Sequence, residues 1–146
     1  MTSATRTRDL HVPPATVWAV LADFDALAIW APDIDHSVLT TEQRDGVGTA
    51  RRVQTGQVTL IERITAWEPD HRLAYDIEGL LPIVRAASNT WTLTPTADGT
   101  LVSLTTRVDT GRRPDKALIG AAVTRKMAEA SDMMLDGLAA HLEDLS

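Results

Sequence analysis

The chain of 146 residues contains no cysteine, which excludes a disulfide framework, a thiolate nucleophile and a zinc site built on thiolates. Aromatic side chains are also few, with one Phe, one Tyr and four Trp. No stretch approaches the roughly 18 apolar residues of a membrane-spanning helix, and the N-terminal segment MTSATRTRDL lacks the apolar run of a signal peptide. These absences predict a cytoplasmic protein with no integral membrane segment.

Basic residues are also fewer than acidic ones. Lys and Arg number 14 against 20 Asp and Glu, which gives a net charge of −6. Because nucleic acids and anionic membranes attract cations, neither is expected as a partner. The length suits one domain over residues 1–146 with a real core, and we expect a monomer or a homodimer.

The most informative stretch lies between residues 17 and 32, where the sequence reads VWAVLADFDALAIWAP. It predicts two short helices, because apolar residues recur at helical intervals and a proline pair precedes them. Asp25 is expected to cap the second helix, and Pro32 to end it. Helices this short cannot bury two tryptophans alone, so we expect them to close one end of a larger element.

Alternation with a period of two dominates the middle of the chain and predicts strands. Six are expected at His36–Thr41, Thr49–Thr55, Val58–Trp67, Leu73–Glu78, Val84–Thr94 and Leu101–Asp109. A further strand is expected at Thr5–Val12, which is rich in Thr and Val and ends at a proline pair. Short turns such as Asp98-Gly99 join successive strands, which indicates antiparallel neighbours. One face of the sheet is expected to be buried, with Ile64 and Ala66 both on that face.

The C-terminal segment Pro114–Leu145 predicts one long helix of roughly 45 Å. Its expected apolar stripe consists of Ile119, Val123, Met127, Ala130, Met134 and Leu138. An antiparallel sheet with one apolar face needs a cover, and this helix is the only predicted element of sufficient size. Small residues beside the stripe either permit close packing or leave space for a ligand.

Several short motifs carry a resemblance to a known superfamily. They are PATVWAVLAD at 14–23, WAP at 30–32, GVGT at 46–49, ERI at 62–64, WEP at 67–69, LAY at 73–75 and DGT at 98–100. In this order they resemble the polyketide cyclase/dehydrase-type branch of the START-like (SRPBCC) superfamily. The resemblance implies an α+β helix-grip fold, with the order strand-helix-helix-six strands-helix. In that fold a curved antiparallel sheet of about seven strands wraps around the long C-terminal helix, and a cavity lies between them.

Three residues are candidates for proton transfer in such a cavity. Glu62 lies on the apolar side of its strand, where it could act as a base or anchor, or form a structural pair with Arg51 or Arg52. Tyr75 could donate a proton or hydrogen bond, or simply fill the core. His36 begins a strand near the expected cavity mouth.

Face assignments extend this set to a predicted ligand site. An inward arginine at position 85 would suit a carboxylate, enolate or phenolate, whereas at the rim it would be solvated. The expected ligand-binding residues are Trp30, Glu62, Tyr75, Arg85, Asn89, Trp91, Val123 and Met127.

No motif predicts a metal or cofactor. The four histidines are scattered, no HExxH occurs, and the segment Asp33–His36 is expected to be a polar turn. Residues Gly46–Gly48 lack the third glycine of a dinucleotide fingerprint and precede a strand.

Three functions remain open at this point. The first is a carrier that binds a small hydrophobic or aromatic molecule between the sheet and the helix. The second is a polyketide aromatase/cyclase-type enzyme, and the third is a protein-interaction domain with a filled core. The sequence identifies neither a ligand nor a reaction.

Overall fold

The computed structural model describes the backbone of residues 1–145 and the side chains of residues 1–143. The strands are β1 (Thr2–Leu10), β2 (His36–Leu39), β3 (Ala50–Thr55), β4 (Val58–Glu68), β5 (Arg72–Glu78), β6 (Ala86–Pro95) and β7 (Thr100–Asp109). The helices are α1 (Pro14–Ala22), the 3₁₀ turn η1 (Phe24–Ala26), α2 (Leu27–Trp30) and α3 (Pro114–Leu145). This order confirms the predicted α+β helix-grip fold, and the bounds of α3 agree with the sequence prediction.

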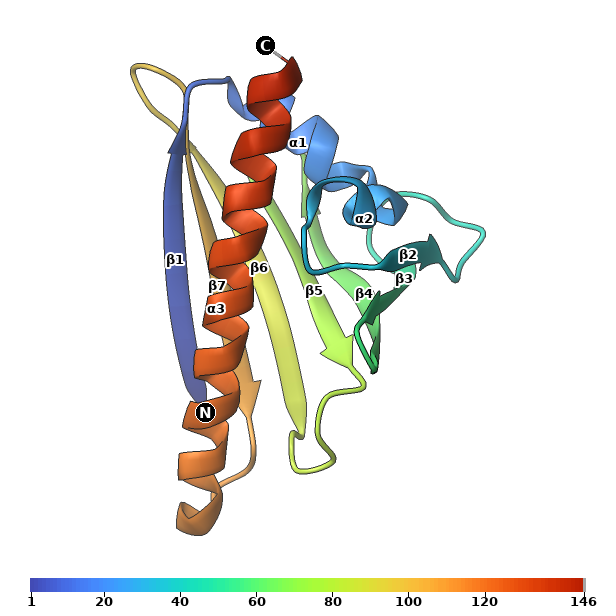
Figure 1. The fold of residues 1–146 in the computed structure, drawn as a ribbon, viewed down its shortest axis with the longest axis vertical. Helices are drawn as coiled ribbons and strands as arrows, with labels where there is room; N and C mark the ends of the chain where they lie inside the picture. The colour runs from blue at the N-terminus through green and yellow to red at the C-terminus, as the bar shows by residue number, and fades with distance from the viewer. Residues whose placement is uncertain (146) are drawn as a thin grey trace.

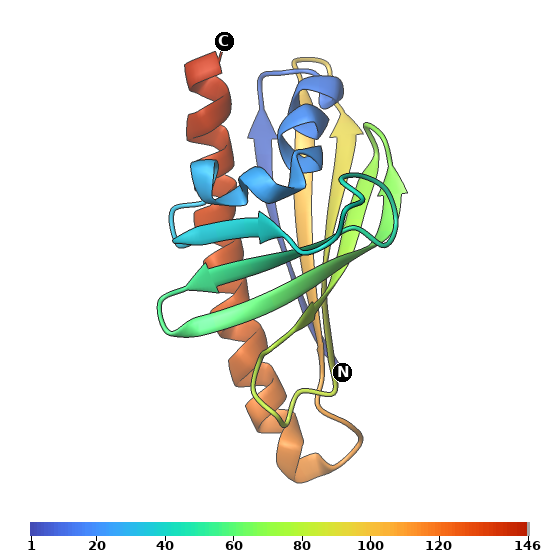
Figure 2. The same cartoon turned by 90° about the vertical axis from the view of Figure 1, so that its right-hand side faces the viewer.

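The seven strands form one antiparallel sheet in the order β1-β7-β6-β5-β4-β3-β2. The first strand begins at Thr2 and ends at Leu10, earlier at both ends than predicted. Figure 1 shows α3 running in front of β7 with β1 beside it, and Figure 2 shows the β3–β4 hairpin curving toward the helix. Among residues 1–145, no helix combines the length and apolar character that crossing a bilayer requires.

A β-bulge in β4 overturns one predicted face assignment. The register between β4 and β5 shifts between Ile64 and Ala66. Beyond the shift Ala66 pairs with Ala74, and Trp67 pairs with the buried Leu73. The extra residue therefore turns Ala66 away from the buried face and brings Trp67 onto it. Trp67 packs edge-on against Trp18 of α1, with ring centroids 5.0 Å apart.

The cap of α2 also differs from the prediction. Asp25 lies inside η1 and its side chain forms an ion pair with Arg44 at 3.0 Å, so it does not cap α2. Ser37 of β2 takes that role instead. Its Oγ accepts the N–H of Ala28 at 3.0 Å and donates to the carbonyl of Asp25 at 2.6 Å. The cap is thus a long-range contact, which local sequence could not reveal.

The buried face of α3 is rotated from the predicted stripe. Ile119 is 41% exposed, and four further members of the stripe are only half-buried; these are Val123, Met127, Ala130 and Met134. The face against the sheet carries small and polar residues at Gly120, Thr124, Ala128 and Ser131, and larger ones only from Leu135 onward. Close approach to β1 explains the rotation, because Thr2 Oγ1 bonds both Thr124 Oγ1 and the carbonyl of Gly120.

A glycine lets α3 approach α2. A Cβ at Gly137 would overlap the carbonyl oxygen of Trp30 and lie 2.6 Å from Cδ of Pro32. Because any side chain would collide with this backbone, Gly137 allows α3 to lie close to the end of α2 (Figure 1).

Candidate functional site

Five neighbouring strands contribute buried polar side chains to a band across the inner face of the sheet. In sheet order they are Arg51, Glu62, Tyr75, Asn89 and Thr106, each at most 5% exposed. Arg51 pairs in register with Glu62, Tyr75 with Asn89, and Asn89 with Thr106. Between β4 and β5 the partners are Glu62 with Ile77 and Ile64 with Tyr75, so Glu62 and Tyr75 are offset by two residues. We call these five residues the polar row.

One end of the polar row is a buried ion pair. Arg51 Nε donates to Glu62 Oε1 at 2.8 Å, and both side chains are more than 90% buried. A second guanidinium nitrogen of Arg51 donates to the carbonyl of Phe24 at 2.9 Å. The guanidinium carbon also lies 3.7 Å from the ring centroid of Phe24 and 4.9 Å from that of Tyr75. Charge, hydrogen bonds and cation–π contacts together hold this arginine in place.

Tyr75 is the centre of the row. Its hydroxyl oxygen accepts hydrogen bonds from Asn89 Nδ2 and Trp91 Nε1, each at 3.3 Å. Because both nitrogens can only donate here, the hydroxyl hydrogen of Tyr75 remains to be donated elsewhere. Burial, followed by the charge of Glu62, raises the pKa of Tyr75 above its ordinary value, although Arg51 and the two hydrogen bonds oppose the rise. The tyrosine is therefore a neutral hydrogen-bond donor at neutral pH.

The other end of the row reaches α3. Thr106 Oγ1 donates to Asn89 Oδ1 at 2.7 Å and lies 3.4 Å from Ser131 Oγ. Ser131 in turn donates to the carbonyl of Met127 at 3.0 Å. These polar contacts therefore link the sheet to the buried face of α3.

A second buried donor lies beside this network. Trp30 of α2 is 7% exposed, and its Nε1 has no hydrogen-bond partner among the described residues. Its ring packs edge-on against Trp91, with centroids 6.1 Å apart. An unpaired buried N–H costs free energy, so this indole marks a place where an acceptor would be stabilising.

The structure brings most of the predicted site residues together. Trp30, Glu62, Tyr75, Asn89 and Trp91 are all buried and belong to, or adjoin, the polar row. Val123 and Met127 lie on the half-buried side of α3.

Two predicted residues lie apart from this group. Arg85 is exposed, in the loop before β6, and His36 is exposed on the edge strand β2. Asp35, beside His36, accepts the N–H of Gly56 and so braces the β3–β4 turn.

Sequence reasoning named Arg51 only as a possible partner of Glu62 and did not include Thr106 or Ser131 in the site. For Arg51 a signal was present, because alternation places it on the same face as the buried Val53. Ser131 could not be found this way, since its role depends on the rotation of α3.

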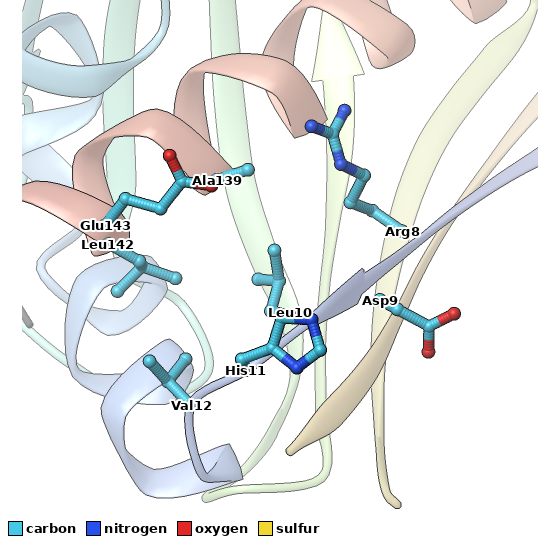
Figure 3. Close-up of a pocket in the computed structure, with 8 residues that line it drawn as sticks. All are labelled: Arg8, Asp9, Leu10, His11, Val12, Ala139, Leu142 and Glu143. Atoms are coloured by element: carbon cyan, nitrogen blue, oxygen red, sulfur yellow. The ribbon is translucent and has the colours of Figure 1, made fainter. Parts of the chain in front are cut away.

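Two pockets lie at opposite ends of α3, away from the row. The first, of about 230 Å³, lies between the end of β1 and the C-terminal part of α3 (Figure 3). Leu10, Val12 and Leu142 form its apolar wall, whereas Asp9 points away from it. The second, of about 760 Å³, opens at the start of α3 and includes Arg85.

This geometry, an antiparallel sheet wrapped around one long C-terminal helix, defines the helix-grip architecture expected from the sequence motifs. The chain belongs to the polyketide cyclase / dehydrase and lipid transport family, whose model matches residues 1–143. The resemblance seen in the sequence motifs is thereby confirmed. None of the curated proteins compared with the chain matches it significantly.

Solved structures from three bacteria share the fold over nearly the whole chain. TTHA0849 from Thermus thermophilus is 21% identical with a TM-score of 0.79, over 99% of both chains. A START superfamily protein from Mycobacterium smegmatis is 16% identical with a TM-score of 0.79, also over 99% of both chains. Zhui aromatase/cyclase from Streptomyces sp. R1128 is 23% identical with a TM-score of 0.75, over 97% of this chain and 93% of that one. At these identities the likeness shows the fold alone.

Proposed function

We propose that the protein is a cytoplasmic carrier that binds a small hydrophobic or aromatic molecule between the sheet and α3, with an oxygen acceptor of the ligand directed at the polar row. The observation that carries the proposal is the pair of unpartnered donors, the hydroxyl of Tyr75 and the indole N–H of Trp30. Both side chains contact Trp91, so one ligand oxygen near this ring could accept from either.

The composition of the interior supports binding over simple packing. A buried ion pair such as Arg51–Glu62 is weak in net stabilisation, and apolar residues of similar volume often stabilise as well or better. A row of five buried polar side chains is therefore a poor way to build a core, but a good way to orient a polar atom of a ligand. We infer that the row provides orientation, and that aromatic and aliphatic neighbours provide affinity.

The half-buried side of α3 supplies the apolar part of the proposed site. Met127 and Met134 pack against the edge of the core, as do Leu60, Leu80 and Val84 from the sheet and its loop. Methionine side chains adapt to different ligand shapes, because they are unbranched and polarisable. These residues suit a flat or chain-like apolar molecule better than a charged one.

A cyclase-type reaction is the second candidate, and one feature favours it. Tyr75 is a protonated donor beside a guanidinium, which is the kind of group that stabilises developing negative charge on a carbonyl oxygen. As a general base, Glu62 would first have to leave its ion pair with Arg51. Turnover of a short poly-β-ketone thioester, lost in Tyr75→Phe, would establish this activity.

The binding test uses two probes of similar shape, 2-acetylnaphthalene with a carbonyl oxygen and 2-isopropylnaphthalene without one. Binding is followed by quenching of tryptophan fluorescence. We expect Tyr75→Phe to weaken binding of the acetyl probe about fivefold, which is the loss of one hydrogen bond of ~1 kcal/mol, and to leave the isopropyl probe unchanged.

A matched pair on α3 tests the location. Val123→Trp should block both probes, because this position is half-buried against the interior, whereas Ala122→Trp should not, because Ala122 is exposed. If neither probe binds the wild type up to its solubility, and Val123→Trp lowers the melting temperature, the interior is filled. The interaction-domain hypothesis would then replace the carrier.

A further inference from the structure

The end of the fold where α3 begins carries an unusual combination of charge and exposed aliphatic groups. The β5–β6 loop and the β7–α3 connection both lie at this end, beyond the body of the sheet (Figures 1 and 2). They adjoin directly, because Arg85 N–H donates to the carbonyl of Asp109 at 2.7 Å. A Cβ at Gly111 would lie 3.3 Å from Cδ of Arg85, so the arginine stem runs along the connection.

Cations dominate this end of a chain that is otherwise acidic. Residues 79–85 and 109–118 contain four basic and two acidic side chains, against a net charge of −6 for the whole chain. Arg85, Arg112 and Arg113 line the 760 Å³ pocket together with the first turn of α3. Arg113 pairs with Asp115 at 3.4 Å, whereas Arg85, Arg112 and Lys116 form no ion pair within the described residues.

Two leucines stand out from the same end. Leu118, in the second turn of α3, is 81% exposed, and Leu81, in the β5–β6 loop, is 56% exposed. Large aliphatic side chains this exposed gain free energy wherever they can leave water. We call this set the basic end: Arg85, Arg112, Arg113, Lys116, Leu81 and Leu118.

We propose that the basic end docks reversibly on an anionic lipid bilayer, with the cations at the headgroups and the two leucines below them. Charge complementarity selects an anionic partner, and the protruding leucines favour a bilayer over an acidic protein, since they need an apolar phase to enter. The rest of the chain is net acidic, which disfavours its approach to the same surface. The proposal departs from the expectation drawn from net charge, because that sum hides the separation of charge along the molecule.

The proposal does not depend on the ligand proposed above. It is tested by co-sedimentation of the full chain with vesicles of phosphatidylcholine alone or with about a third phosphatidylglycerol. We expect binding only to the anionic vesicles, weakening as salt rises because screening acts on exposed charges. Arg112→Gln should lower the partition coefficient about fivefold, and Arg112→Gln with Lys116→Gln about twenty-five-fold, at ~1 kcal/mol per cation.

Substitution of an exposed leucine, with matched controls, distinguishes a lipid bilayer from other anionic partners. Leu118→Ser should lower partitioning at least tenfold, because moving a leucine side chain from water into the apolar part of the bilayer changes the partition coefficient by about that factor or more. Lys126→Gln and Ile29→Ser are matched controls, since both residues are exposed but lie away from the basic end; neither should change binding. The proposal is overturned if anionic vesicles fail to bind the wild type at low salt. It is equally overturned if Leu118→Ser binds as well as the wild type, which would indicate a polyanion or an acidic protein as the partner.

Discussion

Removing one partner of the Arg51–Glu62 pair should destabilise the protein far more than removing both. Arg51→Met leaves the Glu62 carboxylate buried without its cation, and Glu62→Leu leaves the guanidinium with only the Phe24 carbonyl and its aromatic contacts. Each single substitution should lower the free energy of unfolding by about 3–5 kcal/mol, the usual cost of breaking a buried pair. The double variant should lie within ~1 kcal/mol of the wild type, because no buried charge is left unpaired.

The structure argues for the upper part of this range in Arg51→Met. Both side chains are more than 90% buried, and the substitution also removes a 2.9 Å hydrogen bond and a cation–π contact at 3.7 Å. For a chain of this length a loss of 3–5 kcal/mol lowers the melting temperature by roughly 6–20 °C. The contact of methionine with the Phe24 ring recovers part of the aromatic packing, so the loss should not exceed this range.

Urea unfolding followed by tryptophan fluorescence provides the measurement, since the chain has four tryptophans. The four proteins form a double-mutant cycle, and its coupling energy isolates the pair from other effects of each substitution. If either single variant loses less than ~1 kcal/mol, water reaches the pair and the polar row is a solvated surface. If the double variant is as unstable as the singles, the side-chain volumes matter and the charges do not.

The other predictions concern single positions. The pKa of Tyr75 is raised above its ordinary value of 10.0, so the folded protein holds this proton more tightly than the unfolded chain. Its contribution to the free energy of unfolding is therefore fully present below pH 10 and is lost as the pH rises through the folded pKa. Tyrosinate absorbance should report this titration. Between neutral and high pH, Tyr75→Phe should lose less stability than the wild type. Gly137→Ala should destabilise the protein by more than ~2 kcal/mol in thermal unfolding, because the new Cβ meets the Trp30 carbonyl. Alanine is the better helix former, so a stabilised variant would contradict this close contact. Ser37→Ala should lower the free energy of unfolding by ~1 kcal/mol, because it removes the cap of α2. Asp25→Ala should lower it by less, because the Asp25–Arg44 ion pair is exposed. A larger loss in Asp25→Ala than in Ser37→Ala would indicate that Asp25 is the cap.

The order and type of the elements were predictable because they depend on local patterns. Alternation located the strands after Pro32 to within a few residues, and Thr/Val content before a proline pair located the first one. The helix bounds Pro114–Leu145 followed from periodicity and proline. The bulge after Ile64 was not predictable, since no glycine or proline marks it. The cap by Ser37 depends on β2 folding back over η1, which is a tertiary contact that no local pattern encodes.

The site was predictable in its centre and not at its edges. Glu62, Tyr75, Asn89 and Trp91 share the inner face through strand parity alone, which the sequence displays. Their alignment into one row depends on register between strands, and the contact with Ser131 depends on the rotation of α3. Neither quantity can be read from a single chain, because both are set by how the elements meet.

The rotation of α3 and the proposed site have one physical cause. On one side of the helix, Asp132 and Asp136 form ion pairs with arginines of β1, which ties α3 to the edge of the sheet. On the opposite side Gly137 abuts α2, and Val123 and Ala130 lie on the same side at intervals of one heptad. Contacts with β1 and with α2 therefore fix α3 on two opposite sides. Its small residues lie toward β1, and its larger, half-buried residues lie toward the interior. Had the large stripe faced β1 as its apolarity suggests, the helix could not approach that strand so closely. The interior side of α3 would then carry small residues, and the polar row would have no apolar wall beside it.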